Sequence, residues 1–123
     1  MEKIGTGAGR LDLYLQIGSA RQLTFIFRTY DSATDTYTDE DISGKTFVFL
    51  IKKFKGDRKN TVKYTNQSGI TIPIYYTNRI LVNVLAADVT DVNEGEYYWE
   101  LRREDLDQPK IFGLCYLNFD AKE

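Results

Sequence analysis

Apolar and polar residues alternate along most of the chain between residues 11 and 119, which is the pattern of half-buried β-strands. The first such segment places Leu11, Leu13, Leu15 and Ile17 on one face and polar residues or Tyr14 on the other. Turn signals separate the segments about every 10 residues, as in all-β sandwiches. The segments predicted to contain strands are 11–17, 21–28, 46–54, 61–65, 70–75, 80–85, 91–103 and 111–119. The pattern therefore predicts a β-sandwich of seven to eight antiparallel strands, with one helical turn within 86–92.

The segment 91–103, DVNEGEYYWELRR, combines a turn with the strand expected at the centre of the fold. Asn93 and Gly95 suit the turn because both tolerate a positive φ at low cost. The residues expected to face the core are Tyr97, Trp99 and Leu101, and those expected to face water or a partner are Tyr98, Glu100 and Arg102. Trp99 is the only tryptophan in the chain, so we expect its burial to anchor the core.

Some apolar side chains fall on the faces predicted to point away from the core. The segment 46–54, TFVFLIKKF, is apolar on both faces, which predicts that a loop or another subunit covers its second face. Four outward aromatic or apolar residues are candidates for a protein interface, namely Tyr14, Ile26, Tyr75 and Tyr98. If these side chains cluster on the surface, they mark an interface. If they are scattered, they are ordinary surface residues.

Composition narrows the chemistry open to this chain of 123 residues. A hydrophobic share of 42% excludes a disordered chain, and a net charge of −2 argues against nucleic-acid or membrane binding. Cys115 is the only cysteine and there is no histidine, so we expect a buried thiol, with a reactive thiol as the alternative. We also expect no metal or cofactor and no enzymatic activity. Acidic residues that lie close in sequence, such as Glu96 and Glu100, are interpreted as a solvated strand face; paired carboxylates of a catalytic cleft are the alternative.

Two polar segments carry opposite charge. Residues 30–41 are predicted to form an acidic loop, with a cation site or a basic partner as alternatives. Residues 52–63 are predicted to form a basic turn at a hairpin end, and the aromatic Phe54 within it leaves single-stranded nucleic acid as an alternative. The two segments are also suited to docking head to tail between copies.

The ends of the chain look different from its middle. Residues 1–10 contain Gly5, Gly7 and Gly9 and few residues to bury, which predicts a flexible N-terminal arm or one that orders against a neighbouring subunit. Residues 11–119 are expected to form one domain, and residues 120–123 a short tail. The sequence shows neither the apolar run of a signal peptide nor a membrane span, so we expect folding in a cytoplasm.

The turn and strand at 93–99 resemble the start of the sixth strand of immunoglobulin-like domains. There an Asp-x-Gly-x-Tyr-x-Cys pattern places a tyrosine whose hydroxyl bonds back to the turn backbone. Asn93 stands for the aspartate and Trp99 for the cysteine. The resemblance implies an immunoglobulin-like sandwich without an inter-sheet disulfide, in which Trp99 supplies the packing instead.

A second resemblance covers most of the chain from residue 11 to 119. The segment 41–53, DISGKTFVFLIKK, resembles small phage virion domains in which Asp-Leu-Ser-Gly precedes an alternating strand and a basic pair. The family is the N-terminal domain of phage baseplate upper proteins, which also begins with a strand, a polar turn and an aromatic strand, as 11–27 does. A later Gly-x-Tyr strand and a last strand with an internal glycine match Gly95–Leu101 and Gly113. Residues 31–41 and 70–76 have no counterpart.

This resemblance implies a structural part of a phage or prophage particle, made in the bacterial cytoplasm and located in the virion. Its expected partners are other virion structural proteins and further copies of itself, in a ring or trimer, with no catalytic residues. The alternative is an immunoglobulin-like ligand-binding or adhesion module, for example one that binds carbohydrate.

Overall fold

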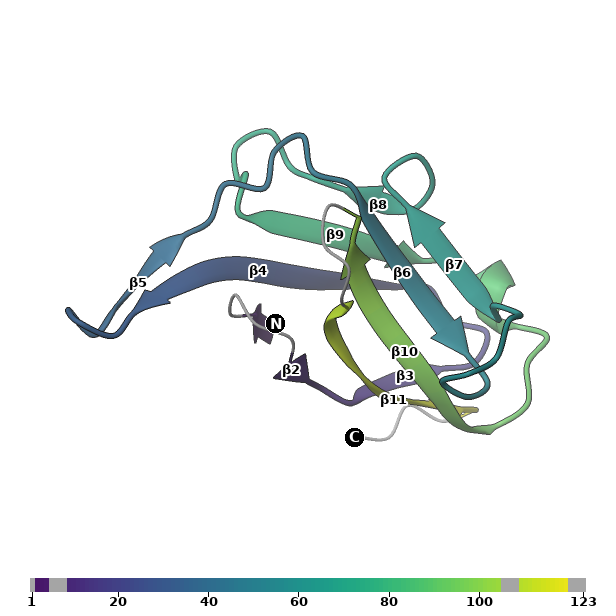
Figure 1. Ribbon diagram of the computed structural model, residues 1–123. Helices are drawn as coiled ribbons and strands as arrows, with labels where there is room; N and C mark the ends of the chain where they lie inside the picture. The colour runs from purple at the N-terminus through teal and green to yellow at the C-terminus, as the bar shows by residue number, and fades with distance from the viewer. Residues whose placement is uncertain (1, 5–8, 105–108, 120–123) are drawn as a thin grey trace.

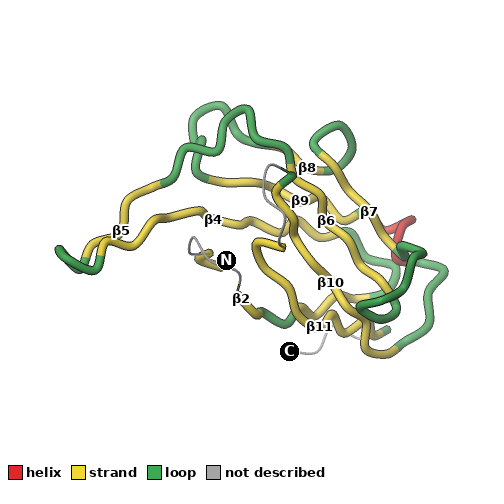
Figure 2. Tube along the Cα trace, in the orientation of Figure 1, coloured by secondary structure: helices red, strands yellow, loops and turns green. Residues whose placement is uncertain are grey.

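The computed structural model describes residues 2–4, 9–104 and 109–119, and these form an all-β fold of two sheets (Figure 1). The strands are β1 (Glu2–Ile4), β2 (Gly9–Arg10), β3 (Leu13–Gln16), β4 (Arg21–Asp31), β5 (Thr36–Asp39), β6 (Phe47–Lys52), β7 (Val62–Thr65), β8 (Ile70–Thr71), β9 (Arg79–Val84), β10 (Gly95–Arg103) and β11 (Pro109–Asn118). The only helical segment in the described residues is the 3-10 turn η1 (Ala86–Val89), coloured red in Figure 2. The predicted all-β class and helical turn are confirmed.

The five-stranded sheet has the order β1-β4-β9-β8, with β5 paired to the outer part of β4. Strand β1 runs parallel to β4, from Glu2 opposite Phe25 to Ile4 opposite Phe27. This differs from the predicted flexible arm, because 2–4 pairs with one sheet and β2 pairs with the other. Residues 1, 5–8 and the predicted tail at 120–123 lie outside the described part of the chain.

The six-stranded sheet has the order β2-β11-β10-β6-β7, and β3 also pairs with β11. Strand β10 is central and antiparallel to both β11 and β6. Strands β2 and β3 both run parallel to β11 and keep one register along it, from Gly9 opposite Ile111 to Gln16 opposite Asn118, so they are two parts of a single edge segment. The predicted central position of the 91–103 strand is confirmed.

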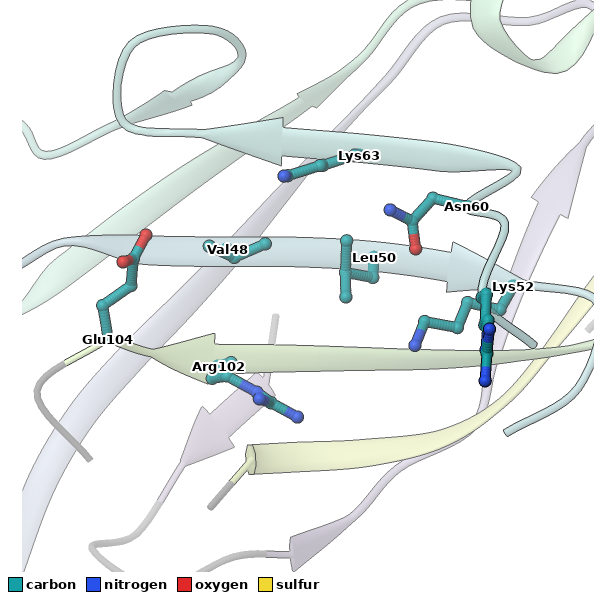
Figure 3. A pocket seen from close by; sticks show the side chains of 8 residues that line it. Val48, Leu50, Lys52, Asn60, Lys63, Arg102 and Glu104 are labelled. Carbon is teal, nitrogen blue, oxygen red and sulfur yellow. The ribbon is translucent and has the colours of Figure 1, made fainter. Parts of the chain in front are cut away.

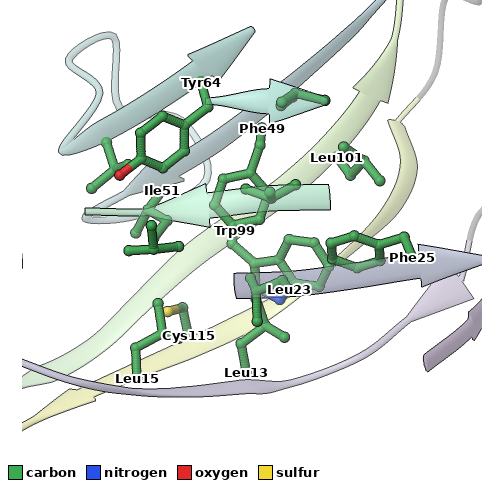
Figure 4. Packing of buried hydrophobic residues seen from close by; sticks show 14 of the residues in the cluster. Leu13, Leu15, Leu23, Phe25, Phe49, Ile51, Tyr64, Trp99, Leu101 and Cys115 are labelled. Atoms are coloured by element: carbon green, nitrogen blue, oxygen red, sulfur yellow. The ribbon is translucent and has the colours of Figure 1, made fainter. Parts of the chain in front are cut away.

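The core lies between the two sheets and centres on Trp99, which is fully buried (Figure 4). The indole packs against Phe25 of β4 and Phe49 of β6, with ring centroids 5.9 and 5.6 Å away. Its N–H donates to the Leu11 carbonyl oxygen at 2.8 Å. The predicted anchoring role of Trp99 therefore includes a hydrogen bond that holds the segment before β3 onto the sheet.

The turn before β10 carries the hydrogen bond that the immunoglobulin-like resemblance implied. The Tyr97 hydroxyl donates to the Asn93 carbonyl oxygen at 2.8 Å. Gly95 lies at φ 148°, a region that favours glycine. The bond ties the chain entering β10 to the turn that precedes it.

Two predicted boundaries are wrong. Residues 30–41 are not a loop: β4 continues to Asp31, and β5 returns beside it, with Arg28 opposite Asp39 and Asp31 opposite Thr36. This β4–β5 hairpin, residues 28–39, extends away from the body (Figure 1). The strand predicted at 70–75 ends at Thr71, because Pro73 has no amide hydrogen to donate to a neighbouring strand. With the short strands at the N-terminus and β5, the described residues contain eleven strands rather than seven or eight.

Candidate functional site

The outward side of the six-stranded sheet, here the outer face, is unusually apolar. The strand registers place opposite residues on the same face, so Glu100 of β10 lies between Leu50 of β6 and Phe112 of β11. The apolar and aromatic side chains of the outer face are Tyr14, Val48, Leu50, Tyr98, Phe112, Leu114 and Tyr116. An antiparallel sheet facing water normally shows polar residues on that side. All of them except Tyr14 and Tyr98 are half-buried, which leaves apolar surface for a partner to cover.

A buried ion pair interrupts this apolar surface. Glu100 is 3% exposed, and its carboxylate lies 2.9 Å from the Arg102 guanidinium. The pKa of Tyr98 is raised to about 12, mainly by burial and secondly by the charge of the neighbouring Glu100 carboxylate. Since both Tyr98 and Arg102 engage Glu100, the carboxylate is satisfied within the sheet and does not point into a cleft with a second acid.

A basic hollow of about 570 Å³ occupies one part of the outer face, over β6, β7 and the end of β10 (Figure 3). Val48 and Leu50 form its apolar floor. Its other lining residues are Lys52, Arg58, Asn60, Lys63, Arg102 and Glu104. Arg102 is already paired with Glu100, but Lys52, Arg58 and Lys63 still outnumber the Glu104 carboxylate around the apolar floor. The hollow therefore suits an anionic group with some apolar surface, such as an acidic protein segment.

The opposite part of the outer face is aromatic. Tyr14 of β3 and Tyr116 of β11 stack with ring centroids 4.9 Å apart and planes 15° apart. The pKa of the Tyr116 hydroxyl is raised, mainly by burial and secondly by the negative charges of Glu96 and Asp12. Sequence reasoning missed Tyr116 and Leu114, although apolar residues on both faces of 111–119 carried the same signal as segment 46–54.

The four predicted interface residues do not form one site. Tyr14, 39% exposed, and Tyr98 both lie on the outer face of the six-stranded sheet. Ile26 lies on the outer side of the other sheet. Tyr75, 90% exposed, adjoins a smaller acidic hollow at the base of the hairpin. The interface role of each residue stays a prediction.

The expected exposure of Ile26 and Tyr98 is wrong, because they are only 3% and 7% exposed. Both side chains point away from the core as predicted, but each belongs to an inner strand. Ile26 is flanked in register by β1 and β9, and Tyr98 by Lys52 of β6 and Leu114 of β11. Neighbouring strands therefore shield an outward side chain that the sequence alone places in solvent.

The Cys115 thiol is fully buried in the core beside Leu13 of β3. Burial raises its pKa to about 12, against a smaller opposing effect of the Arg21 charge. The thiolate is the reactive form, and at pH 8 almost none of it exists.

We therefore expect Ellman's reagent to label the folded protein far more slowly than the protein in urea. Absorbance at pH 8 measures both rates. Equal rates in the two conditions would mean that the thiol is accessible, and would return the reactive-cysteine alternative to consideration.

Within the described residues, no group of three or more Asp, Glu, Cys or His side chains is arranged to hold a metal ion. The same part of the chain has no helix with the length and hydropathy needed to span a membrane. No protein-family model matches the sequence, and no curated protein is significantly similar to it.

Proposed function

We propose that the protein is a non-enzymatic assembly module of a phage or prophage particle that acts through protein–protein contacts. The observation that supports this most is the outer face, where apolar side chains flank β10 on both sides: Val48 and Leu50 on β6, and Phe112, Leu114 and Tyr116 on β11. Apolar side chains grouped on one exposed sheet face, with charged residues among and around them, are typical of a protein interface. The virion setting rests on the resemblance of segment 41–53 to baseplate domains.

We also propose that the sandwich has immunoglobulin-like topology. In such domains four strands in the order A-B-E-D face a sheet that contains C, F and G. The orders β1-β4-β9-β8 and β6-β10-β11 correspond to these, and β7 corresponds to an added C′ strand. The Tyr97–Asn93 hydrogen bond supports the same assignment at the start of strand F. Strand β1 departs from the pattern because it is parallel to β4.

In this assignment aromatic packing replaces the disulfide that links strands B and F. Phe25 of β4 and Trp99 of β10 occupy those two strands and contact across the sheets. Trp99 is therefore committed to the core. The carbohydrate-binding alternative would have to rely on tyrosines, and we do not favour it.

The proposal predicts that the chain is a component of purified particles. In the bacterium that carries the coding sequence, prophage induction and density-gradient purification are expected to yield a particle band that contains the chain by mass spectrometry. Its absence from particles, with abundant chain in the cell lysate, would contradict the virion role.

Two matched variants test whether the outer face makes the contact. Leu114→Glu places a charge on the outer face, and Thr71→Glu places the same charge on an exposed position of the other sheet. We expect both variants to fold, with Leu114→Glu lost from particles and Thr71→Glu retained. Equal incorporation of two folded variants would show that assembly uses another surface.

A further inference from the structure

Residues 31–39 of the β4–β5 hairpin contribute little to the core. Every residue from 31 to 39 is exposed, and β5 pairs with β4 alone among the described strands. A two-stranded hairpin by itself is marginally stable in water. Its turn is nonetheless defined, because the Asp31 carboxylate accepts a hydrogen bond from the Ala33 amide at 2.9 Å, and Asp35 adopts φ 53°.

The hairpin region is strongly acidic. Residues 31–41 contain five acidic side chains and no lysine or arginine. Two arginines offset part of this charge, since Arg28 of the hairpin lies 3.3 Å from Asp39 and Arg103 of β10 lies 2.7 Å from Glu40. The region therefore keeps a net negative charge on an extended, exposed element.

The basic hollow carries the complementary charge. Lys52, Arg58, Lys63 and Arg102 surround its floor, with Glu104 as the single acid. Three of the six basic residues of segment 52–63, namely Lys52, Arg58 and Lys63, line the hollow, and the other three lie outside it. The apolar floor of the hollow offers a surface on which the ring of Tyr37 in the hairpin could pack, since Tyr37 is 65% exposed.

The two charged features face away from each other in one molecule. The chain leaves the hairpin before β6 begins at Phe47, whereas the basic turn follows the end of β6 at Lys52. Figure 1 shows the hairpin extending from one side of the body and the β6–β7 turn on the other. A hairpin that extends outward in this way does not reach the basic turn of its own chain, so its outer acidic residues are placed to meet such a turn in another molecule.

The geometry points to head-to-tail self-association, in which the acidic hairpin of one copy docks in the basic hollow of the next. Such a contact uses two different surfaces and therefore produces a ring where the rotation closes and a filament where it does not. The inference rests on the proposed assembly function, and it specifies a second copy of the chain as one partner.

Charge-exchange variants test this contact. The hairpin variant carries Asp31→Asn, Asp35→Asn, Thr36→Lys and Thr38→Lys. Asparagine keeps an acceptor for the Ala33 amide and tolerates a positive φ, and both threonines are exposed. The hollow variant carries Lys52→Glu, Arg58→Glu and Lys63→Glu. A control carries Lys53→Glu, Lys55→Glu and Lys59→Glu, which change the same total charge outside the hollow.

Sedimentation velocity over a concentration series is expected to show self-association of the wild type that weakens from about 20 mM to about 500 mM salt. Each variant alone should weaken association at least about tenfold, because several exposed charge pairs are lost together. An equal mixture of hairpin and hollow variants should associate again, because each variant then meets a surface of opposite charge. The control should associate like the wild type.

Several results would overturn the inference. These are a wild type that stays monomeric at low salt, a mixture of folded variants that fails to associate, and a control as weak as the hollow variant. Binding of an oligothymidine probe to the hollow, without self-association, would equally overturn it in favour of nucleic acid. Thermal melting by circular dichroism verifies folding, and the hollow variant keeps the test decisive if the hairpin variant unfolds. Retention of the chain in particles despite any of these results would leave the assembly function standing and remove only the hairpin contact.

Discussion

Replacing Trp99 with alanine is expected to lower the free energy of unfolding by about 3–5 kcal/mol. The indole is fully buried between the two sheets, where it contacts Phe25 and Phe49. Alanine would leave a cavity between those rings, because the two hydrogen-bonded sheets can move together only in part to fill the space of the indole. Loss of the indole N–H would also remove the hydrogen bond to the Leu11 carbonyl oxygen.

Urea unfolding followed by circular dichroism measures this effect, since removing the only tryptophan also removes the fluorescence signal. Trp99→Phe is the matched control, because it keeps an aromatic ring and loses the donor. We expect the free energy of unfolding of this variant to lie between that of the wild type and that of the alanine variant. An alanine variant with nearly the wild-type midpoint would show that Trp99 does not anchor the core.

Gly113→Ala is expected to destabilise the domain strongly. Overpacking typically costs about 1–3 kcal/mol, and we expect the cost here to reach or exceed the upper end of that range. A Cβ atom at Gly113 would lie 1.9 Å from the Leu11 carbonyl oxygen. That oxygen belongs to the backbone of residue 11, which two hydrogen bonds hold in place: the Trp99 indole N–H donates to the Leu11 carbonyl oxygen, and the Leu11 amide donates to the Phe112 carbonyl oxygen. Relief of the clash therefore requires the segment before β3 to move off the sheet.

Gly56→Ala is the control for this substitution. Gly56 lies in the exposed turn after β6, and a Cβ atom there has no atom within 4 Å. Because its φ is in the ordinary range, alanine should be neutral or stabilise the domain by about 0.4–1 kcal/mol. Chemical unfolding of both variants measures the difference. Equal stability of the two would mean that residue 11 is not packed tightly over β11.

Much of the fold followed from short-range patterns. The alternation in 91–103 correctly predicted that Tyr97, Trp99 and Leu101 point into the core. The hairpin was missed because all of its residues from 31 to 39 are exposed, so no alternation of burial marks it. The remaining signal was the β-propensity of the Thr36–Thr38 triplet beside a turn-forming Asp35.

The candidate site was less predictable than the fold. Outward apolar residues on 46–54 indicated a covered second face, and the structure places Glu100 between Leu50 and Phe112 on that face. The grouping of those residues depends on which strands are neighbours and in which register. No local pattern in the sequence contains that information.

The sequence by itself determined which side chains of each strand point inward, because successive residues of an extended backbone turn to opposite sides. Only the tertiary structure decided which outward side chains remain accessible. Ile26 and Tyr98 are shielded by strands on both flanks, whereas Tyr75 has no such neighbours and is exposed. The physical reason is that direction is a property of the local backbone, while exposure depends on strands that are distant in the chain.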